Sequence, residues 1–339
     1  MPESNAIINK IKMHLRQTLD ALIPAKSICA LIDFPQYSNV GDSAIWLGEI
    51  AYLKQRQCQI RYVCDCTNYN PKALASIIGT GIILLQGGGN FGDLYPRHQK
   101  LRECVLNDFP NNRIIQLPQS IFFSDLENLA LTQKFLSAHQ DFHFVVRDKP
   151  SFSFAQKHFI NPLYLCPDMA MMLDLKPLKN RSKSTDVVIL SRSDNEKATS
   201  FDLSESLPFK YHVTDWLDEP IPKLQILYDW THLRLGWGSK VPRILLNQLN
   251  LYAANAMAKE RLDRGLNILG EGNFVITDRL HALILSWLGK TPVSFVDNNY
   301  GKLSNYIDAW LSDSDGQQQC DSLKEALELT SNLIKTDSY

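Results

Sequence analysis

The sequence predicts an α/β protein with mostly parallel sheets. Short apolar runs rich in β-branched residues alternate with segments of helical periodicity along most of the chain, and this alternation is typical of a parallel sheet with helices on both faces. Polar or glycine-rich residues directly follow many of the apolar runs. Because the carboxyl ends of parallel strands meet at one edge of a sheet, we expect these residues to line a common ligand site.

Length and composition exclude several other classes of protein. The 339 residues are long enough for two domains, and 45% hydrophobic with 21% charged residues is a globular composition. A formal net charge of −1 argues against nucleic acid as the main partner. The seven cysteines show no paired metal-ligand spacing, so we predict no metal site and a reducing compartment.

Residues 1–24 predict an amphipathic helix. Its apolar positions recur at helical spacing, which favours a core or domain-packing face over docking to a membrane surface. Charged residues such as Lys10 and Asp20 interrupt the segment and exclude a secretion signal. No apolar run in the sequence approaches the ~18–20 residues of a membrane span. We therefore expect a cytoplasmic protein, which associates peripherally with the inner membrane face if its substrate is lipid-linked.

The first half has the elements of one α/β domain. A polar, basic segment at 176–185 then has the composition of a linker. We therefore assign residues 1–178 to an N-terminal domain and 185–339 to a C-terminal domain. The strands predicted in the first half lie at residues 27–34, 59–64, 81–86, 112–117, 142–146 and 163–166, with helices at 43–53 and 71–78.

The second half begins with predicted strands at 186–191 and 209–214. Residues 215–243 lack a clear period and are expected to be mostly loop, whereas residues 244–266 have helical composition. Serine and glutamate at positions 322 and 325 form a capping box for a last helix. We expect this helix to pack back on the first domain.

The most informative pattern is the β-α-β unit at residues 274–297. Two apolar, β-branched runs flank a helix that Thr277 or Asp278 is placed to cap. Arg279 and His281 fall in the first turn of this helix, where free backbone N–H groups favour an anion. We therefore predict a phosphate or carboxylate site. The alternative is a surface arginine beside a histidine that is hydrogen-bonded under a loop.

The glycines after the third strand match a dinucleotide fingerprint, but we reject that interpretation. Gly87, Gly89 and Gly92 satisfy G-x-G-x-x-G. The match lies on the third strand and not the first, and residues 93–96 are a poor opening for a phosphate-binding helix. We expect instead a flexible loop that lets substrate approach the backbone closely.

Polar and charged residues near these turns suggest two kinds of ligand group. Asn39, Asp42, Asn90 and Asp93 suit sugar hydroxyls, with the alternative that they are turn residues only. Arg192 ends the first strand of the second half, so it and Arg279 are expected to face one cleft and bind a doubly charged ligand. Lys302 is a candidate for a third positive charge.

Taken in order along the chain, these motifs resemble those of the polysaccharide pyruvyl transferases. The resemblance runs from about residue 39 to residue 310. It rests on Asn39-Val40-Gly41-Asp42, Gln86-Gly87-Gly88-Gly89-Asn90, Pro118-Gln119-Ser120, Arg147-Asp148, Pro167-Asp168, Leu190-Ser191-Arg192, Thr277-Asp278-Arg279-Leu280-His281 and Gly301-Lys302.

The resemblance implies two Rossmann-like domains arranged as in GT-B glycosyltransferases, with the ligand cleft between them. It also implies transfer of the pyruvyl group of phosphoenolpyruvate to two hydroxyls of one sugar, with a cyclic ketal and phosphate as products and no cofactor. By this resemblance Arg192, Arg279 and His281 bind phosphoenolpyruvate on the C-terminal domain, and the acceptor sugar, in a polysaccharide or a lipid-linked precursor, lies on the N-terminal side. The substrate-binding residues that we predict are Asn39, Gly41, Asp42, Gly88, Gly89, Asn90, Asp93, Leu280 and Lys302.

The chemistry makes His281 the candidate acid and base, because imidazole titrates near neutrality. Asp42, Asp93 and Asp278 are alternatives for taking the hydroxyl proton, and the sequence does not choose among them. Two other functions stay open. One is a GT-B glycosyltransferase that uses a nucleotide sugar, since a fold does not fix a function. The other is a non-catalytic glycan-binding protein of polysaccharide assembly.

Overall fold

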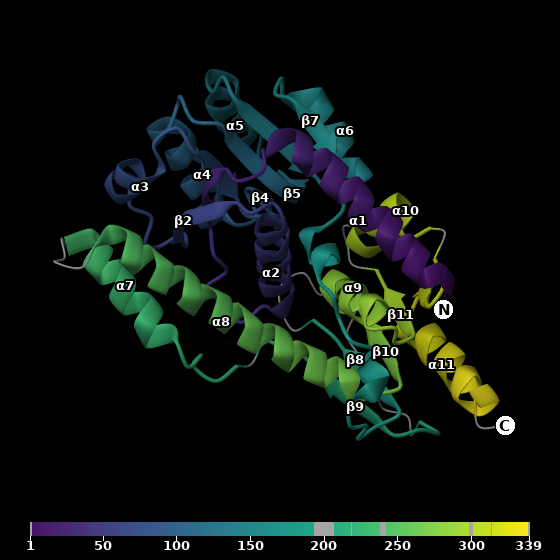
Figure 1. Ribbon diagram of the computed structural model, residues 1–339. Coiled ribbons are helices and arrows are strands. Elements are labelled where there is room, and N and C mark those ends of the chain that lie inside the picture. Colours follow the sequence, from purple (N-terminus) through teal and green to yellow (C-terminus); the bar gives the residue numbers. More distant parts are fainter. Residues whose placement is uncertain are drawn as a thin grey trace.

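The computed structural model describes residues 2–192, 207–217, 219–237, 242–297, 301–312 and 314–337. These residues form two parallel sheets surrounded by helices (Figure 1). The α/β class with parallel sheets is therefore confirmed.

The first sheet has seven strands in the order β2-β1-β3-β5-β6-β7, and β4 pairs with the later part of β5. The strands are β1 (Ile28–Ile32), β2 (Gln59–Cys64), β3 (Ile82–Leu85), β4 (Gly88–Gly92), β5 (Ile114–Phe122), β6 (Phe142–Val146) and β7 (Leu163–Leu165). The helices of this part are α1 (Pro2–Leu22), α2 (Val40–Gln55), α3 (Pro71–Ile78), α4 (Pro96–Asp108), α5 (Leu126–Ala138) and α6 (Lys149–His158), followed by the 3-10 helices η1 (Met169–Met172) and η2 (Leu178–Asn180).

The glycine-rich segment after β3 differs from the expected flexible loop, because it forms β4. Gly88 lies opposite Gln119 and Gly92 opposite Phe122 in parallel pairing with β5. At Gly92 φ is +113°, and a Cβ atom would lie 1.8 Å from the backbone oxygen of Phe122. Glycine is needed there because the two backbones approach closely and the conformation is left-handed.

The second sheet has five strands in the order β12-β11-β10-β8-β9. The strands are β8 (Val187–Leu190), β9 (Tyr211–Thr214), β10 (Phe274–Thr277), β11 (Val293–Val296) and β12 (Gln317–Cys320). The helices are α7 (Gln225–Trp237), α8 (Arg243–Gly270), α9 (Leu280–Leu288), α10 (Lys302–Trp310) and α11 (Leu323–Asp337). The expectation that residues 215–243 are mostly loop was wrong, because α7 occupies about half of that range.

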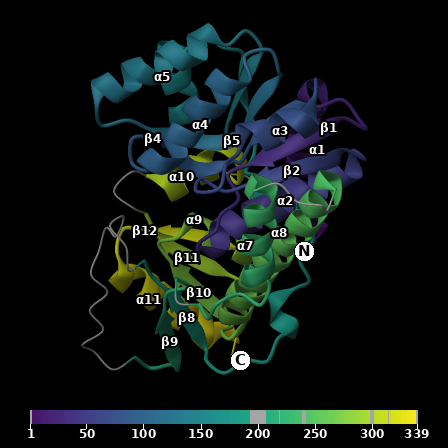
Figure 2. The same cartoon turned by 90° about the vertical axis from the view of Figure 1, so that its left-hand side faces the viewer.

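Two helices of the C-terminal part contact the elements of both sheets. Helix α8 packs on α2 and β2 and also on β8 and α9 (Figure 2). Helix α10 packs on α6 and α9. The last helix, α11, packs on β10, β11 and β12 instead of returning to the first sheet as expected. Its buried Ala326 joins the apolar side chains of the second sheet in one cluster, so α11 completes that sheet's own core.

The apolar face of α1 belongs to the core, as the preferred interpretation predicted. Leu15 and Leu19 are fully buried there. They share one hydrophobic cluster with Val188 and Leu190 of the second sheet. The expected domain boundary at 178–185 stays a prediction. No helix within the described ranges combines the length and the apolar composition needed to cross a bilayer.

Candidate active site

A cavity of about 410 Å³ lies where residues that follow strands of both sheets come together. Its cationic side chains are Arg147, Arg192, Arg279 and Lys302. Its other lining residues are Tyr37, Asn39, Asp42, Gly89, Asn90, Tyr95, His98, Trp216, Leu217, Leu280 and His281.

The structure brings most of the predicted site residues into this cavity. The predicted residues that line it are Arg192, Arg279, His281, Asn39, Asp42, Gly89, Asn90, Leu280 and Lys302. Gly41 and Gly88 lie just behind it, against His281 and Asp42 respectively.

Asp93 does not line the cavity. Its carboxylate accepts hydrogen bonds from the backbone N–H groups of Ser124 and Asp125, at 2.8 and 2.7 Å from Oδ2. The side chain therefore holds the turn that precedes α5, and the structure offers no contact of Asp93 with a ligand in this cavity.

The connection between β10 and α9 fixes the position of His281. Arg279 is the N-cap residue of α9, and neither Thr277 nor Asp278 caps this helix as expected. Thr277 Oγ1 instead accepts from the Arg279 N–H at 3.0 Å and donates to the Leu190 carbonyl at 2.7 Å, so it ties this turn to β8.

Asp278 ties the same turn to Arg192. Its Oδ1 accepts from the Arg192 N–H at 2.9 Å. Burial raises the pKa of this carboxyl, and the side chain does not line the cavity. Its place is structural, since it joins the backbones that carry the two predicted arginines.

His281 is paired with a buried carboxylate. Its Nε2 lies 3.4 Å from Asp168 Oδ2, and Arg147 Nη1 lies 2.6 Å from the same oxygen. Asp168 is fully buried. Burial alone would raise its pKa, but the charges of His281 and Arg147 outweigh that effect and hold the pKa of Asp168 below its ordinary value. The Arg147–Asp168–His281 chain therefore keeps an anion next to the imidazole.

Two glycines make room for these side chains. A Cβ atom at Gly41 would lie 2.4 Å from His281 Nδ1, and one at Gly89 would lie 3.1 Å from Arg147 Nη2 and 3.9 Å from Lys302 Nζ. The first turn of α2 therefore contacts the imidazole ring directly, and β4 passes close to two cations. A side chain at either glycine would crowd the groups that form the site.

Arg279 is held by a residue that the sequence did not single out. Its Nε and Nη2 lie 2.8 and 2.7 Å from the two carboxylate oxygens of Asp215, and its guanidinium carbon lies 5.9 Å from the ring centre of Trp216. Both partners directly follow β9. A two-point carboxylate contact fixes the plane of a guanidinium, so Asp215 orients Arg279 in the cavity.

Uncharged polar groups are also held in fixed positions. Asn39 caps α2, accepting from the Gly41 N–H at 3.0 Å and donating to Asp42 Oδ2 at 2.8 Å. The side-chain oxygen of Asn90 accepts from Gln119 Nε2 at 2.7 Å and from Arg102. The oxygen of Asn90 is thus occupied, and its amide nitrogen is the group oriented to donate to a ligand.

Sequence reasoning missed the roles of several lining residues. Arg147 is part of one of the family-like motifs, and its role in the cavity follows from its position directly after β6. Tyr37, Tyr95 and His98 were not singled out at all, and their only signal was position: Tyr37 in the loop after β1, and the other two at the start of α4.

The fold and the cavity define an α/β protein with a cationic ligand site at the carboxyl ends of parallel strands. The model of the polysaccharide pyruvyl transferase family matches residues 39–300. The chain belongs to this family.

Named relatives agree with this assignment. The putative pyruvyl transferase EpsO of Bacillus subtilis is 31% identical over 316 residues, which cover 89% of this chain and 90% of that protein. Pyruvyl transferase 1 of Schizosaccharomyces pombe is 33% identical over 300 residues, which cover 83% of this chain and 69% of that protein. The crystal structure of an uncharacterized Klebsiella pneumoniae protein has a TM-score of 0.58 at 18% identity, covering 92% of this chain and 99% of that one. This last likeness shows a shared fold.

Proposed function

We propose that this protein transfers the pyruvyl group of phosphoenolpyruvate to two hydroxyls of one sugar in a polysaccharide or its precursor, releasing phosphate. The observation that carries the proposal is the meeting of four cationic side chains and the buried Asp168–His281 pair in one cavity. The family assignment supports pyruvyl transfer to a polysaccharide. The donor and the ketal product are the parts added by this proposal.

The cationic groups suit the donor because phosphoenolpyruvate carries a phosphate and a carboxylate. Arg192, Arg279 and Lys302 follow strands of the second sheet, and Arg147 adds a guanidinium from the first. Guanidinium groups bind both kinds of anion through two parallel hydrogen bonds. Asp215 and Asp168 each neutralise part of this charge and fix one arginine in orientation, so the site is preorganised and not merely positive.

The proposed reaction needs a proton at C3 and two hydroxyl oxygens at C2. His281 donates the proton to C3 as the first hydroxyl attacks C2, and the Asp168 carboxylate stabilises the imidazolium before transfer. The second hydroxyl then attacks C2 while the bond from C2 to the phosphate oxygen breaks. Of the two hydroxyl protons, one ends in the new methyl group and the other on released phosphate, so the balance closes.

The uncharged part of the cavity suits the acceptor. Asn39, Asp42 and Asn90 present amide and carboxylate groups, and Tyr37 and Tyr95 present aromatic rings. Sugars are bound by this combination because their hydroxyls form hydrogen bonds and their C–H faces pack on aromatic rings. This set of residues supports a sugar as the acceptor.

Calorimetry with phosphoenolpyruvate tests the donor assignment. We expect binding to the native chain and at least a tenfold loss of affinity in Arg279→Ala, since a charge-assisted contact contributes about 1.5–3 kcal/mol. Arg113→Ala is the matched control, because Arg113 Nε also contacts a carboxylate, that of Asp141 at 3.1 Å, away from the cavity.

Other outcomes would select another function. Binding of a nucleotide sugar but not of phosphoenolpyruvate would identify a glycosyltransferase. Binding of a glycan with no phosphate release from phosphoenolpyruvate would identify a non-catalytic protein of polysaccharide assembly.

A further inference from the structure

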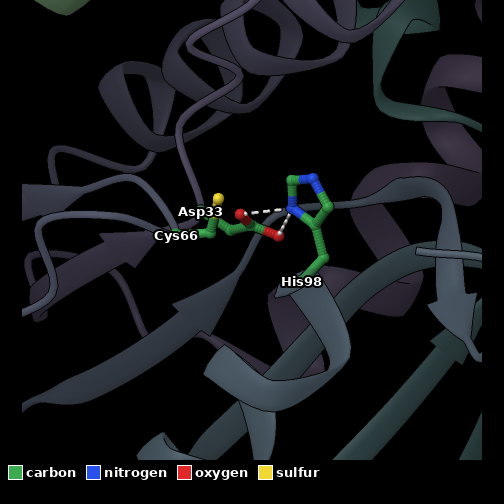
Figure 3. Close-up of side chains that lie close together, drawn as sticks. All are labelled: Asp33, Cys66 and His98. Atoms are coloured by element: carbon green, nitrogen blue, oxygen red, sulfur yellow. Dashed lines mark hydrogen bonds and ion pairs between the residues drawn. The ribbon is translucent and has the colours of Figure 1, made fainter. Parts of the chain in front are cut away.

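A second pair of a carboxylate and a histidine faces the same cavity. Asp33 follows β1, Cys66 follows β2 and His98 lies in the first turn of α4. Their functional atoms lie within 4.8 Å of one another (Figure 3). His98 Nδ1 is 2.8 and 3.0 Å from the two carboxylate oxygens of Asp33. The same ring lines the cavity. The mechanism above leaves this pair unused.

The Asp33 carboxylate determines which ring nitrogen of His98 carries the proton. A neutral histidine that faces a carboxylate through Nδ1 must donate from Nδ1, so the lone pair is on Nε2. Among the described residues Nε2 has no hydrogen-bond partner. The ring is also fixed laterally by edge-on contacts with Tyr37 and Tyr95, whose ring centres lie 5.9 and 6.4 Å away. His98 is therefore a positioned proton acceptor among the residues that suit a sugar.

Asp33 is held firmly in this position. It is 3% exposed and has a φ of +80°, a left-handed conformation that costs a non-glycine residue about 1 kcal/mol. Its N–H donates to the Cys64 carbonyl at 2.9 Å. The buried guanidinium of Arg102 lies 3.6 Å from its Oδ2 and is itself bound to Gln116 and to Asn90. Arg102 therefore places a fixed positive charge beside the carboxylate of Asp33.

A metal site is the other interpretation of this cluster, and the electrostatics oppose it. Burial, together with Asp33 and Asp65, raises the pKa of the Cys66 thiol to about 11, whereas a metal needs the thiolate. Arg102 already supplies positive charge to Asp33. His98 Nδ1 also lies at hydrogen-bonding distance from both oxygens of that carboxylate. A histidine–carboxylate pair explains these contacts better than three metal ligands do.

We propose that His98, oriented by Asp33, takes the proton of the sugar hydroxyl that attacks C2 of phosphoenolpyruvate. This inference rests on the proposed function and assigns its missing base. In the first stage the hydroxyl oxygen bonds to C2, its proton moves to His98 Nε2, and His281 gives a proton to C3. In the second stage the second hydroxyl bonds to C2 and returns a proton to His281, while the departing phosphate takes the proton from His98. His98 is then a catalytic residue, and Asp33 is a positioning residue.

Kinetics of paired variants test the assignment. We expect His98→Gln to lower kcat for pyruvyl transfer by about 100-fold or more, which is the range of a general base, with phosphoenolpyruvate affinity within twofold of native. The low-pH limb of the kcat profile that reports the base should disappear in this variant. Asp33→Asn should lower kcat by about tenfold or more and shift that limb, since asparagine keeps the shape but not the charge.

Two control variants change residues of the same kind, or of the same cluster, that are not expected to contact the substrate. His212 Nδ1 also faces a carboxylate, that of Glu271 at 2.9 Å, on the exposed edge strand β9, so His212→Gln should keep native kcat. Cys66→Ser should also keep native kcat. Full activity in His98→Gln would overturn the proposal, as would stoichiometric zinc in the native protein that Cys66→Ser removes together with activity.

A spectroscopic readout separates failure of this inference from failure of the proposed function. In protein labelled with ¹⁵N-histidine, the His98 signal is identified by its loss in His98→Gln, and at neutral pH it should show protonated Nδ1 and unprotonated Nε2. The preference should weaken in Asp33→Asn. A protonated Nε2 in the native protein overturns the inference whatever the activity is. If the tautomer is as expected but phosphoenolpyruvate does not bind to the native chain, it is the proposed function that fails.

Discussion

Replacing Gly41 by alanine is expected to displace His281 without unfolding the protein. The added Cβ would lie 2.4 Å from Nδ1, 2.7 Å from Cγ and 2.9 Å from Cβ of that histidine. An ordinary contact begins at 3.4 Å, so the ring must move by about 1 Å. The ring borders the cavity, but the Cβ of His281 moves only with the α9 backbone, so α2 and α9 must also separate by about 0.5 Å. Alanine itself favours a helix over glycine by up to about 1 kcal/mol.

This displacement separates an effect on the reaction from an effect on stability. His281 Nε2 is already 3.4 Å from Asp168, and a shift of about 1 Å would break that contact and move the proton donor away from C3. Misplacement of this size costs about 100-fold in rate. We therefore expect initial rates of pyruvyl transfer to fall by about two orders of magnitude, with the thermal midpoint changed by only a few degrees.

Gly48→Ala, in the same helix, is the contrasting variant. Its Cβ would meet the backbone oxygen of Met169 at 1.9 Å, and this backbone cannot turn aside as a side chain does. We expect it to destabilise the fold by about 1–3 kcal/mol or more. Native rates in Gly41→Ala would refute the idea that close approach of α2 positions His281.

Three further predictions concern charge and stability. Asp168→Asn should lower the free energy of unfolding in urea by about 3–5 kcal/mol, because Arg147 keeps its buried charge without the counter-ion. The pKa of Asp168 is depressed in the folded protein, so the stability that this carboxylate contributes is present above the unfolded pKa of about 3.9 and is lost as the pH falls below that value. The variant should lack this acid sensitivity. Asp93→Ala should cost about 1 kcal/mol by freeing the Ser124 and Asp125 N–H groups, and a change in phosphoenolpyruvate affinity would contradict its place outside the cavity. Burial lowers the pKa of His232 to about 4, so as the pH falls below about 6.5 the imidazole takes up a proton in the unfolded chain before it does so in the folded protein. The free energy of unfolding in urea should therefore fall by up to about 2 kcal/mol between pH 7 and pH 5. An equal loss in His232→Gln would exclude this cause.

Local patterns in the sequence predicted the parts of the site that are set by neighbours along the chain. The β-strand, the helix and the glycine of residues 274–289 are close in sequence, so their period and composition were enough to place Arg279 and His281 at the end of a strand. The carboxyl-edge rule then placed Arg192 near Arg279, because β8 and β10 pair in parallel in one sheet. Asn39 follows a strand of the other sheet, and the rule alone does not bring two sheets together.

Contacts between distant segments were beyond such patterns. Asp168 lies 113 positions before His281, and Asp215 lies 64 positions before Arg279. The composition around these residues does not predict which residue each of them contacts. Asp93 shows the converse. As an aspartate beside a glycine it looked like the cavity residues, and its role was decided by two backbone N–H groups 31 and 32 positions away.

Helix α8 has a consequence for how the molecule responds to heat. Its 28 residues span about 42 Å. On the side of the first sheet, Asn250 donates a hydrogen bond to the Val63 carbonyl at 3.0 Å, and Arg261 donates one to the Pro35 carbonyl at 2.8 Å. On the side of the second sheet, the helix packs on β8 and α9. Separating the sheets would break these buried bonds, at about 1–3 kcal/mol for each group left without a partner. Neither sheet can therefore melt alone at little cost. The chain should unfold as one cooperative unit, with a single calorimetric transition whose enthalpy equals the van't Hoff value.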